Sequence, residues 1–334
     1  MPLQILTHLD CLAARKVAGQ SLPKRRIGQQ MAVALDIRDR QLSETLFALF
    51  PRSEQVYIVL AYFDESEQQR EALNAACISA VTGTGLQWAN VTRAWEKVLE
   101  EYDVRDSEGR RVFHAVDFET PEGRIGTVYA EWTDERRKAF HRALLDSFAH
   151  SGIQAIAPSV IVSDYTEVAE RLMKARHALD PSGQYKYFNN KYCFLALFAM
   201  LFAGHEAVKY HPKAEQAAYY FETGGGYQDF VDSLYLTAIN DEKLSEAFRF
   251  ASTPIFAPKD YAAALQVADK IAYEVSKHVS HYHDPNPPIQ YSELVSGNLR
   301  WKTRYAMLHL NERGFDIKIP FWRKDELEDF FKLN

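Results

Sequence analysis

The first residues that could do chemistry are two carboxylates directly after a hydrophobic run. The run VYIVLAYF begins at Val56 and leads into Asp64 and Glu65. Because neighbouring strand residues face opposite sides of a sheet, only one of the two can point into a given site while the strand continues, and we favour Asp64. An unpaired buried carboxylate is costly, so such an acid caps a turn, pairs with a cation or binds metal. Turn capping is the simpler alternative.

A second group of titratable residues lies in the segment FHAVDFE, which contains His114, Asp117 and Glu119. As a strand, this segment places Asp117 and Glu119 on one face and His114 on the other. A turn after Val116 would instead bring His114 and Asp117 together. The residues do not decide between these arrangements, and the alternative to a site is a structural histidine beside solvated acids.

Two further acids occupy notable positions. Asp269 lies in a helix expected to begin near Asp260, and its neighbours at helical spacing are mostly apolar or small. It therefore pairs with a buried cation or approaches a metal. Glu222 ends the strand-like AAYYFE just before three glycines, which permit a tight turn and a close ligand. No Lys-Ser/Thr follows, so this is not a phosphate-binding P-loop, and a solvated strand-end acid is the alternative.

Histidines near the end of the same helix form another candidate. His278, His281 and His283 lie beside Asp284 and suggest a transition-metal site. The segment covers a helix end and a proline-rich linker, where histidines interact favourably with the helix dipole without any metal, and we prefer that explanation. The sequence contains neither a Gly-x-Ser-x-Gly elbow nor a dinucleotide glycine fingerprint, so it signals neither a hydrolase of that type nor a dehydrogenase.

The elements that must position these acids alternate between strands and helices. We expect strands at residues 56–63, 76–82, 111–118, 153–162, 216–222 and 250–256, and helices at 86–101, 133–150, 165–177, 191–203, 258–279 and 291–310. The first strand is apolar on both faces, as a central strand covered on both sides must be. The alternation predicts an α/β fold.

Composition excludes several classes of protein. Of the 334 residues, 47% are hydrophobic and 25% charged, which is typical of a globular chain and excludes a disordered or collagen-like one. The net charge of -6 argues against a general polyanion-binding coat. Three scattered cysteines are too few for a disulfide framework, the longest apolar run (193–203) is too short for a membrane span, and the amino terminus lacks a secretory signal. We therefore expect a cytoplasmic protein without membrane contact.

Three segments together resemble the family known as domain of unknown function 3800. They are YIVLAYFDES, FHAVDFET followed by EWTDERRKAFHRALL, and PKDYAAALQVADKIAYEV. The family pattern has an Asp-Glu-Ser strand end, a His-x-x-Asp-Phe segment, a Trp-x-x-Glu-like helix start and a late Gln-x-Ala-Asp-x-x-Ala-Tyr helix, and its order and approximate spacing match over about residues 55–280. The resemblance implies a ribonuclease H-like fold, a mixed sheet flanked by helices whose acids come from the first strand, a middle strand and a late helix.

The resemblance also implies roles for individual residues. Asp64 would be the first-strand acid, Glu222 the middle-strand acid and Asp269 the late-helix acid, with His114 and Asp117 nearby. Relatives often carry Asp where this chain has Glu222, which makes Glu222 the least secure ligand.

The activity implied is that of a metal-dependent nuclease. All-oxygen ligands suit Mg²⁺ or Mn²⁺. Two ions roughly 4 Å apart would share Asp64, with Asp269 and Glu222 each holding one ion, and would activate water and stabilise the leaving oxygen. The expected metal ligands are Asp64, Asp117, Glu222 and Asp269, while His114 would position water or carry a proton, and Glu65 completes the candidate catalytic residues.

Two other functions fit the same pattern. The fold could serve as a non-catalytic interaction or scaffold protein, for example in a bacterial defence or mobile-element system, and an acidic metal site could also hydrolyse another phosphate ester. The expected division is a basic, helical N-terminal extension (1–53), the ribonuclease H-like domain (54–280) and a linker with a C-terminal helical extension (281–334). Nucleic acid is the expected substrate, and either extension could bind a second copy or a protein partner. The basic residues from Arg15 to Arg26 could contact phosphates, although solvated helix surface is the simpler explanation.

Overall fold

The structure is a computed structural model that describes residues 57–68, 74–177, 184–210, 214–282, 310, 313–315 and 317–331. The predicted N-terminal extension, with its basic residues and Cys11, lies outside these residues. So do residues 283–309, which include most of the linker and of the helix predicted at 291–310.

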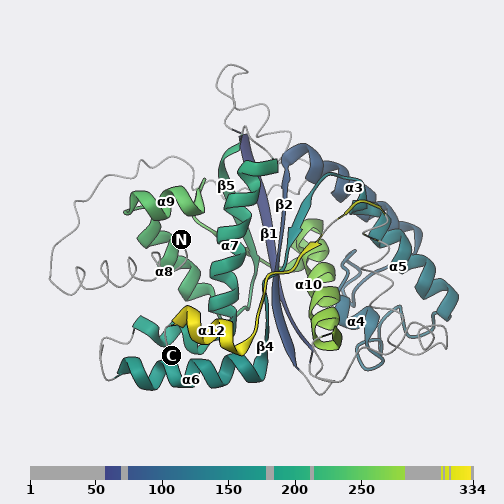
Figure 1. Ribbon diagram of the computed structural model, residues 1–334. Coiled ribbons are helices and arrows are strands. Elements are labelled where there is room, and N and C mark those ends of the chain that lie inside the picture. Colours follow the sequence, from purple (N-terminus) through teal and green to yellow (C-terminus); the bar gives the residue numbers. More distant parts are fainter. Residues whose placement is uncertain are drawn as a thin grey trace.

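A mixed β-sheet forms the centre of the described chain, as the sequence predicts (Figure 1). Its strand order is β6-β5-β1-β2-β3-β7, with β4 and β8 alongside. Strand β1 pairs antiparallel with β2 and parallel with β5, and β5 pairs parallel with β6. These four strands are β1 (Tyr57–Gln68), β2 (Ala75–Thr84), β5 (Ala214–Glu222) and β6 (Ile255–Ala257). Because β1 has strands paired on both sides, the described part of the predicted first strand, residues 57–63, is central, as predicted.

Four shorter strands complete the sheet edge next to β2. They are β3 (Gln154–Ile156), β4 (Ser159–Ile161), β7 (Ile317–Lys318) and β8 (Phe321–Trp322). The single strand predicted at 153–162 is thus divided around Pro158, which has no N–H to donate to a ladder. Strand β7 pairs with β3 and β8 with β4, so the described C-terminal residues belong to the same sheet as the rest of the chain.

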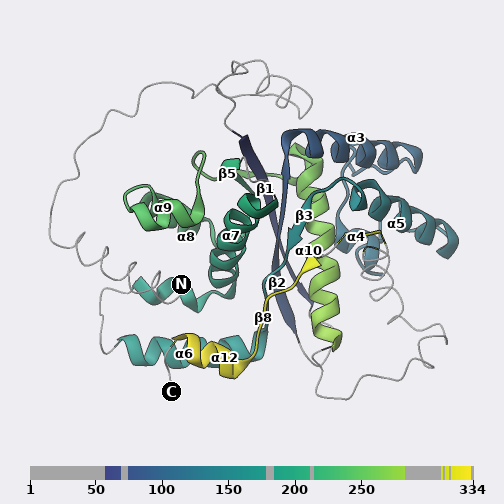
Figure 2. The same cartoon turned by 45° about the horizontal axis from the view of Figure 1, so that its top comes forward.

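Helices cover one face of the sheet on the side of α10 (Figure 1). They are α3 (Gly85–Glu101), α4 (Ala115–Glu119), α5 (Asp134–Ala149) and α10 (Ala263–Tyr282). Helix α10 lies directly against β1 and β2, and the two views agree on this arrangement (Figure 2). The Ser79 hydroxyl donates to the Ala268 carbonyl at 2.7 Å, a close approach that the small alanines of α10 permit.

The opposite face is covered by a second group of helices. They are α6 (Val162–His177), α7 (Lys191–Tyr210), α8 (Gln228–Ala238), α9 (Glu242–Phe248) and α12 (Lys324–Phe331). The most apolar of them, α7, packs its buried side chains against the sheet, as predicted for a core helix. Within the described residues, every helix is too short or too polar to cross a bilayer.

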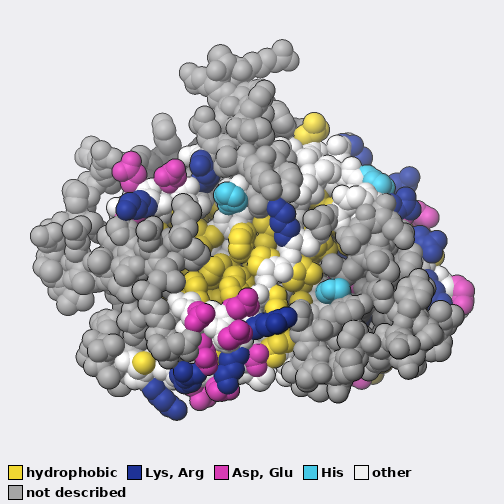
Figure 3. Space-filling model, viewed as in Figure 1, with side chains coloured by type: hydrophobic (Ala, Val, Ile, Leu, Met, Phe, Trp, Pro, Cys, Tyr) yellow, Lys and Arg dark blue, Asp and Glu magenta, His cyan; other side chains and the backbone are white. Residues whose placement is uncertain are grey.

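Surface charge near the carboxyl end of the chain is mixed rather than of one sign. Figure 3 shows acidic and basic side chains side by side over α6 and α12. Two ion pairs join these helices, Arg171 with Glu328 and Lys324 with Glu167. Exposed pairs of this kind contribute little to stability, so the packing of Leu327 and Phe331 into the core holds α12 in place.

Two predicted strands are wrong in part or whole. The segment predicted as a strand at 111–118 enters the helix α4 after His114, because its backbone is held by side chains of α10 and not by a neighbouring strand. The Phe113 N–H donates to Gln266 Oε1 at 3.0 Å and the Ala115 N–H donates to Asp269 Oδ2 at 2.8 Å. The strand predicted at 250–256 reduces to β6 and one bridge at Phe250.

Candidate functional site

Three of the predicted acids come together at the end of the parallel strands. Phe63 of β1 pairs with Phe221 of β5, and the next residue on each strand is an acid, Asp64 or Glu222. Parallel strands end at the same edge of a sheet, which is where open α/β sheets bind ligands. Helix α10 crosses this end of β1 and contributes Asp269. The three acids that the family resemblance assigns to one site therefore lie close together in the structure.

The ammonium group of Lys259 lies between these three carboxylates. Its Nζ is 3.1 Å from Asp64 Oδ2, 2.9 Å from Glu222 Oε2 and 3.3 Å from Asp269 Oδ1. Lys259 belongs to the 3₁₀ turn η2 (Lys259–Tyr261), which links β6 to α10. We call these four residues the Lys259 cluster. The sequence analysis missed the lysine, although its position at the entrance to the α10 motif, PKDYAAAL, is a signal that a cation lies near the acids.

The Lys259 cluster has more acids than bases and is mostly buried. Asp64 is 1% exposed and Lys259 is 12% exposed, whereas Glu222 reaches toward solvent at 23%. Burial raises the pKa of Asp64 well above its usual value, and the charge of Asp269 raises it further, while Lys259 lowers it. Burial alone would lower the pKa of Lys259, but the three carboxylates raise it above its usual value. Lys259 therefore carries its proton, and the site has a deficit of positive charge.

Glu65 lies on the other face of β1, although the charges of Glu222 and Lys259 still act on it. Strand β1 continues past Asp64 to Gln68, so alternation still applies, and the preference for Asp64 over Glu65 is supported. The Tyr227 hydroxyl donates to Glu65 Oε2 at 2.8 Å. Burial raises the pKa of Glu65, and this hydrogen bond opposes the rise. Among the described residues Glu65 forms no ion pair with Lys259, and its catalytic role stays a prediction.

His114 and Asp117 are brought beside the cluster by α4. His114 precedes the helix and Asp117 lies in its first turn, while the intervening Ala115 N–H is bound by Asp269. Burial raises the pKa of Asp117, the charge of His114 lowers it and the charge of Asp269 raises it. The sequence left open whether His114 and Asp117 converge, and the helix places them close enough for their charges to interact.

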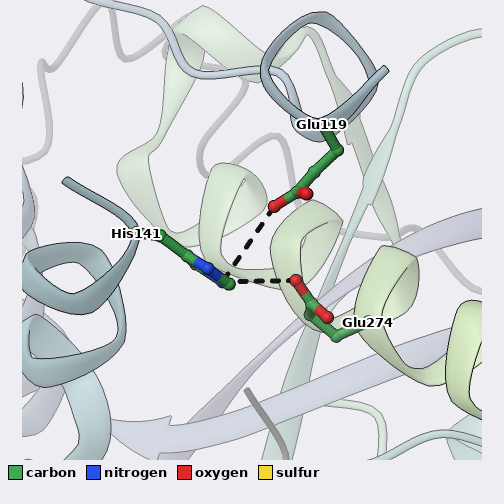
Figure 4. Close-up of side chains that lie close together, drawn as sticks. All are labelled: Glu119, His141 and Glu274. Atoms are coloured by element: carbon green, nitrogen blue, oxygen red, sulfur yellow. Dashed lines mark ion pairs between the residues drawn. The ribbon is translucent and has the colours of Figure 1, made fainter. Parts of the chain in front are cut away.

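A second group of charged residues lies further along α10, toward its carboxyl end. Figure 4 shows Glu119 of α4, His141 of α5 and Glu274 of α10 pointing toward one another. Lys270 Nζ lies 2.6 Å from Glu119 Oε1 and 2.6 Å from Glu274 Oε1, and His141 Nε2 lies 3.3 Å from Glu274 Oε1. We call Glu119, His141, Lys270, Glu274 and Lys277 the Lys270 network.

Charges in the Lys270 network balance. Lys277 Nζ lies 3.8 Å from Glu119 Oε2, so two glutamates face two lysines. Burial alone would raise the pKa of Glu119, but Lys270 and Lys277 lower it to about 2. The pKa of Glu274 is lowered below its usual value by the same lysines, against the effect of burial. Both glutamates are therefore ionised and paired.

Two groups of residues could thus hold a metal ion, and they differ in donors and spacing. Within the described residues, Glu119, His141 and Glu274 form the one group of three side-chain ligand atoms that lie within 4.8 Å of one another. Lys270, however, already forms ion pairs with both carboxylates of this group, Glu119 and Glu274. The acids of the Lys259 cluster are spread more widely around an ammonium, but they offer only oxygen and include the buried Asp64 Oδ2, which lies 3.1 Å from Lys259 Nζ. This donor set fits Mg²⁺ or Mn²⁺.

The structure describes only part of the predicted histidine site. His278 lies on α10, in the helical region where the dipole explanation applies. The side chain of His281 and the residues His283 and Asp284 lie outside what the structure describes.

Comparisons with models of known protein families, with curated proteins and with solved structures found no match. The resemblance to domain of unknown function 3800 therefore stays a prediction carried by the motifs themselves.

Proposed function

We propose that this protein is a divalent-metal-dependent nuclease with a ribonuclease H-like domain. The observation that carries the proposal is the convergence of Asp64, Glu222 and Asp269, from three separate elements, on a single ammonium group. Buried acids in excess of their basic partners are unfavourable, so an arrangement that gathers them is understandable when a cation binds there. The mixed sheet and the order of the acids agree with the fold that the motifs imply.

The residues that would hold the ion are Asp64, Glu222 and Asp269, with Asp117 close by. A divalent ion bound there would supply a Lewis acid that stabilises the negative charge developing on a phosphoryl group. Asp269 is held in orientation by the Ala115 N–H, and Asp64 by a hydrogen bond from the Glu65 N–H to its Oδ1 at 2.9 Å. Each acid thus keeps one oxygen directed toward the cation position.

Residues around the acids would act on the substrate directly. Lys259 presents a permanent positive charge that can bind a phosphate oxygen, since it stays protonated among the carboxylates. His114 is partly exposed and lies beside Asp117, a pairing that can orient a water molecule and accept its proton. We assign His114 the proton transfer and Asp117 the orientation of the imidazole.

Nucleic acid is the substrate that we propose, acted on in the cytoplasm. The net charge of -6 makes phosphate binding without a metal ion weak, because lysines and arginines drive such binding. A bound cation reverses the local field at the acids. Cys77 and Cys193 are buried free thiols, in keeping with a reducing compartment.

The test is cleavage of single-stranded DNA, duplex DNA, RNA and free nucleotides with Mg²⁺ or Mn²⁺. We expect cleavage of a polynucleotide that requires the ion. Asp64→Asn should reduce it more than about a hundredfold, since loss of even an outer partner of a metal ligand costs 10–100-fold. The matched control is Asp260→Asn, which removes an acid next to Lys259 that pairs with Arg110 outside the cluster. Undiminished cleavage by Asp64→Asn would contradict the proposal.

Two other outcomes would point to the alternative functions. Cleavage of nucleotides alone would indicate a hydrolase of another phosphate ester. Negligible Mn²⁺ binding that is equal in the wild-type protein and in a variant lacking both Asp64 and Asp269 would favour a scaffold. In that case Lys259 would serve only to neutralise buried acids.

A further inference from the structure

The number of cations that the Lys259 cluster accepts can be argued from its oxygen atoms. Two ions, which the family resemblance implies, need a shared carboxylate that binds one ion with each oxygen. In Asp64 only Oδ2 faces the cluster, while Oδ1 is turned toward the Glu65 N–H at 2.9 Å, so the two oxygens do not both face the cation position. Asp269 is in the same position, with Oδ2 held by the Ala115 N–H at 2.8 Å and Oδ1 directed at Lys259. Each acid thus turns one oxygen toward the cation position.

The position where a second ion would sit is already filled. Lys259 Nζ lies within 3.3 Å of an oxygen from each of the three acids, so the ammonium bridges them as a shared ion would. Its side chain is 12% exposed and enters the cluster from a short turn fixed between β6 and α10. Lys259 is therefore built into the site and is not a surface side chain that happens to reach it.

The charge of the cluster leads to the same count. Three carboxylates and one ammonium leave two negative charges, which one divalent ion neutralises. Two divalent ions beside Lys259 would give the group an excess of two positive charges in a mostly buried place, at a large cost. This count covers the acids that form ion pairs with Lys259. Asp117 and Glu65 feel the charge of Lys259 but form no ion pair with it among the described residues.

We infer that the site binds a single divalent ion and that the ammonium of Lys259 takes the place of the second. This rests on the proposed function, because it concerns the same metal site. With one ion bound, Lys259 remains as the fixed positive charge that the substrate phosphate meets. The reaction then needs one metal-binding event, not two.

The experiment is a calorimetric Mn²⁺ titration combined with electron paramagnetic resonance of the Mn²⁺-loaded chain. Two Mn²⁺ ions about 4 Å apart are magnetically coupled, whereas a lone ion gives the six-line spectrum. We expect the wild-type protein to bind one uncoupled ion and Lys259→Met to bind two coupled ions. Lys259→Arg keeps the charge and should bind one ion. Lys324→Met, which removes a lysine paired with Glu167 at the surface, is the matched control and should equal the wild type.

Circular dichroism melting shows whether each variant folds. Even if Lys259→Met does not fold, the number of Mn²⁺ ions bound by the wild-type protein decides between one ion and two. A coupled pair of ions in the wild-type protein would overturn the inference while leaving the proposed function standing. One ion of unchanged affinity in folded Lys259→Met would overturn the role of Lys259. The absence of any bound Mn²⁺ in the wild-type protein would overturn both the inference and the proposed function.

Discussion

The Lys259 cluster and the Lys270 network share one helix and yet have opposite electrostatic character. Asp269 and Lys270 are adjacent on α10, and α4 touches both groups, through the Ala115 N–H and through Glu119. In the cluster, three acids surround one lysine, and the pKa of Asp64 is raised by burial and by Asp269. In the network, two glutamates face two lysines, and the pKa of Glu119 falls to about 2 despite its burial.

We propose that this difference separates a cation-binding site from a structural ion-pair network. Buried charges that are fully paired hold elements together, and losing one partner is costly. Buried charges that are not fully paired are unfavourable until something binds. The Lys270 network therefore fixes α4 and α5 against α10, while the Lys259 cluster keeps capacity for a cation. Ligand spacing alone points to Glu119, His141 and Glu274, whereas charge balance favours the Lys259 cluster, which is the site that we propose.

The largest effect on stability is expected from Lys270→Met. The substitution leaves Glu119 and Glu274 buried beside each other without their shared ammonium, which should lower the free energy of unfolding by about 3–5 kcal/mol. Urea denaturation measures the change, and added Mn²⁺ should not restore the loss. Lys324→Met is the control, because its exposed pair should matter little. A decrease in the free energy of unfolding no greater than in this control would mean that the Lys270 network does not stabilise the fold.

A smaller effect is expected from pH. The pKa of Glu274 is lower in the folded chain than its ordinary 4.5, so its ionised form stabilises the fold above that pH. As pH falls below about 4.5 and through the lower folded value, this stabilisation is lost. The difference in free energy of unfolding between the wild-type protein and Glu274→Gln should therefore stay constant from neutral pH to about pH 6 and shrink in acid.

Urea denaturation at a series of pH values measures that difference. Glu100→Gln is the control, because Glu100 pairs with Arg111 at the surface and should matter little at any pH. A difference between wild type and Glu274→Gln that grows as the pH falls would contradict the paired state of Glu274.

Much of the fold follows from local patterns in the sequence. The central strand β1 is predicted from the sequence because the apolar run VYIVLAYF requires cover on both faces. Helix α3 was predicted from Trp88, Trp95 and their neighbours at helical spacing, and these residues are buried in the structure. Helix α4 was not predicted, because its segment alternates like a strand. Gln266 binds the Phe113 N–H just before α4 and Asp269 binds the Ala115 N–H at its start. Both partners are more than 150 residues away, so no local sequence pattern can indicate them.

The site shows the same limit. Asp64, Glu222 and Asp269 were found because they stand at strand ends or on an apolar helix face, and the family resemblance put them together. Lys259 was missed because its position beside the α10 motif is a weak signal: a lysine next to Pro258 at the start of a helix is usually exposed. The Lys270 network was missed because Lys270 and Glu274 are spaced like an exposed helix pair, and only tertiary packing buries them.

The central claim is that the cation site lies at Asp64 and not at Glu274. The most direct measurement is a crystal structure of the protein soaked in Mn²⁺, with the ion located by its anomalous scattering. We predict one peak bonded to Asp64 and Asp269, with Lys259 beside it and Lys270 still between Glu119 and Glu274. A peak held by Glu119, His141 and Glu274, with none at Asp64, would contradict this account.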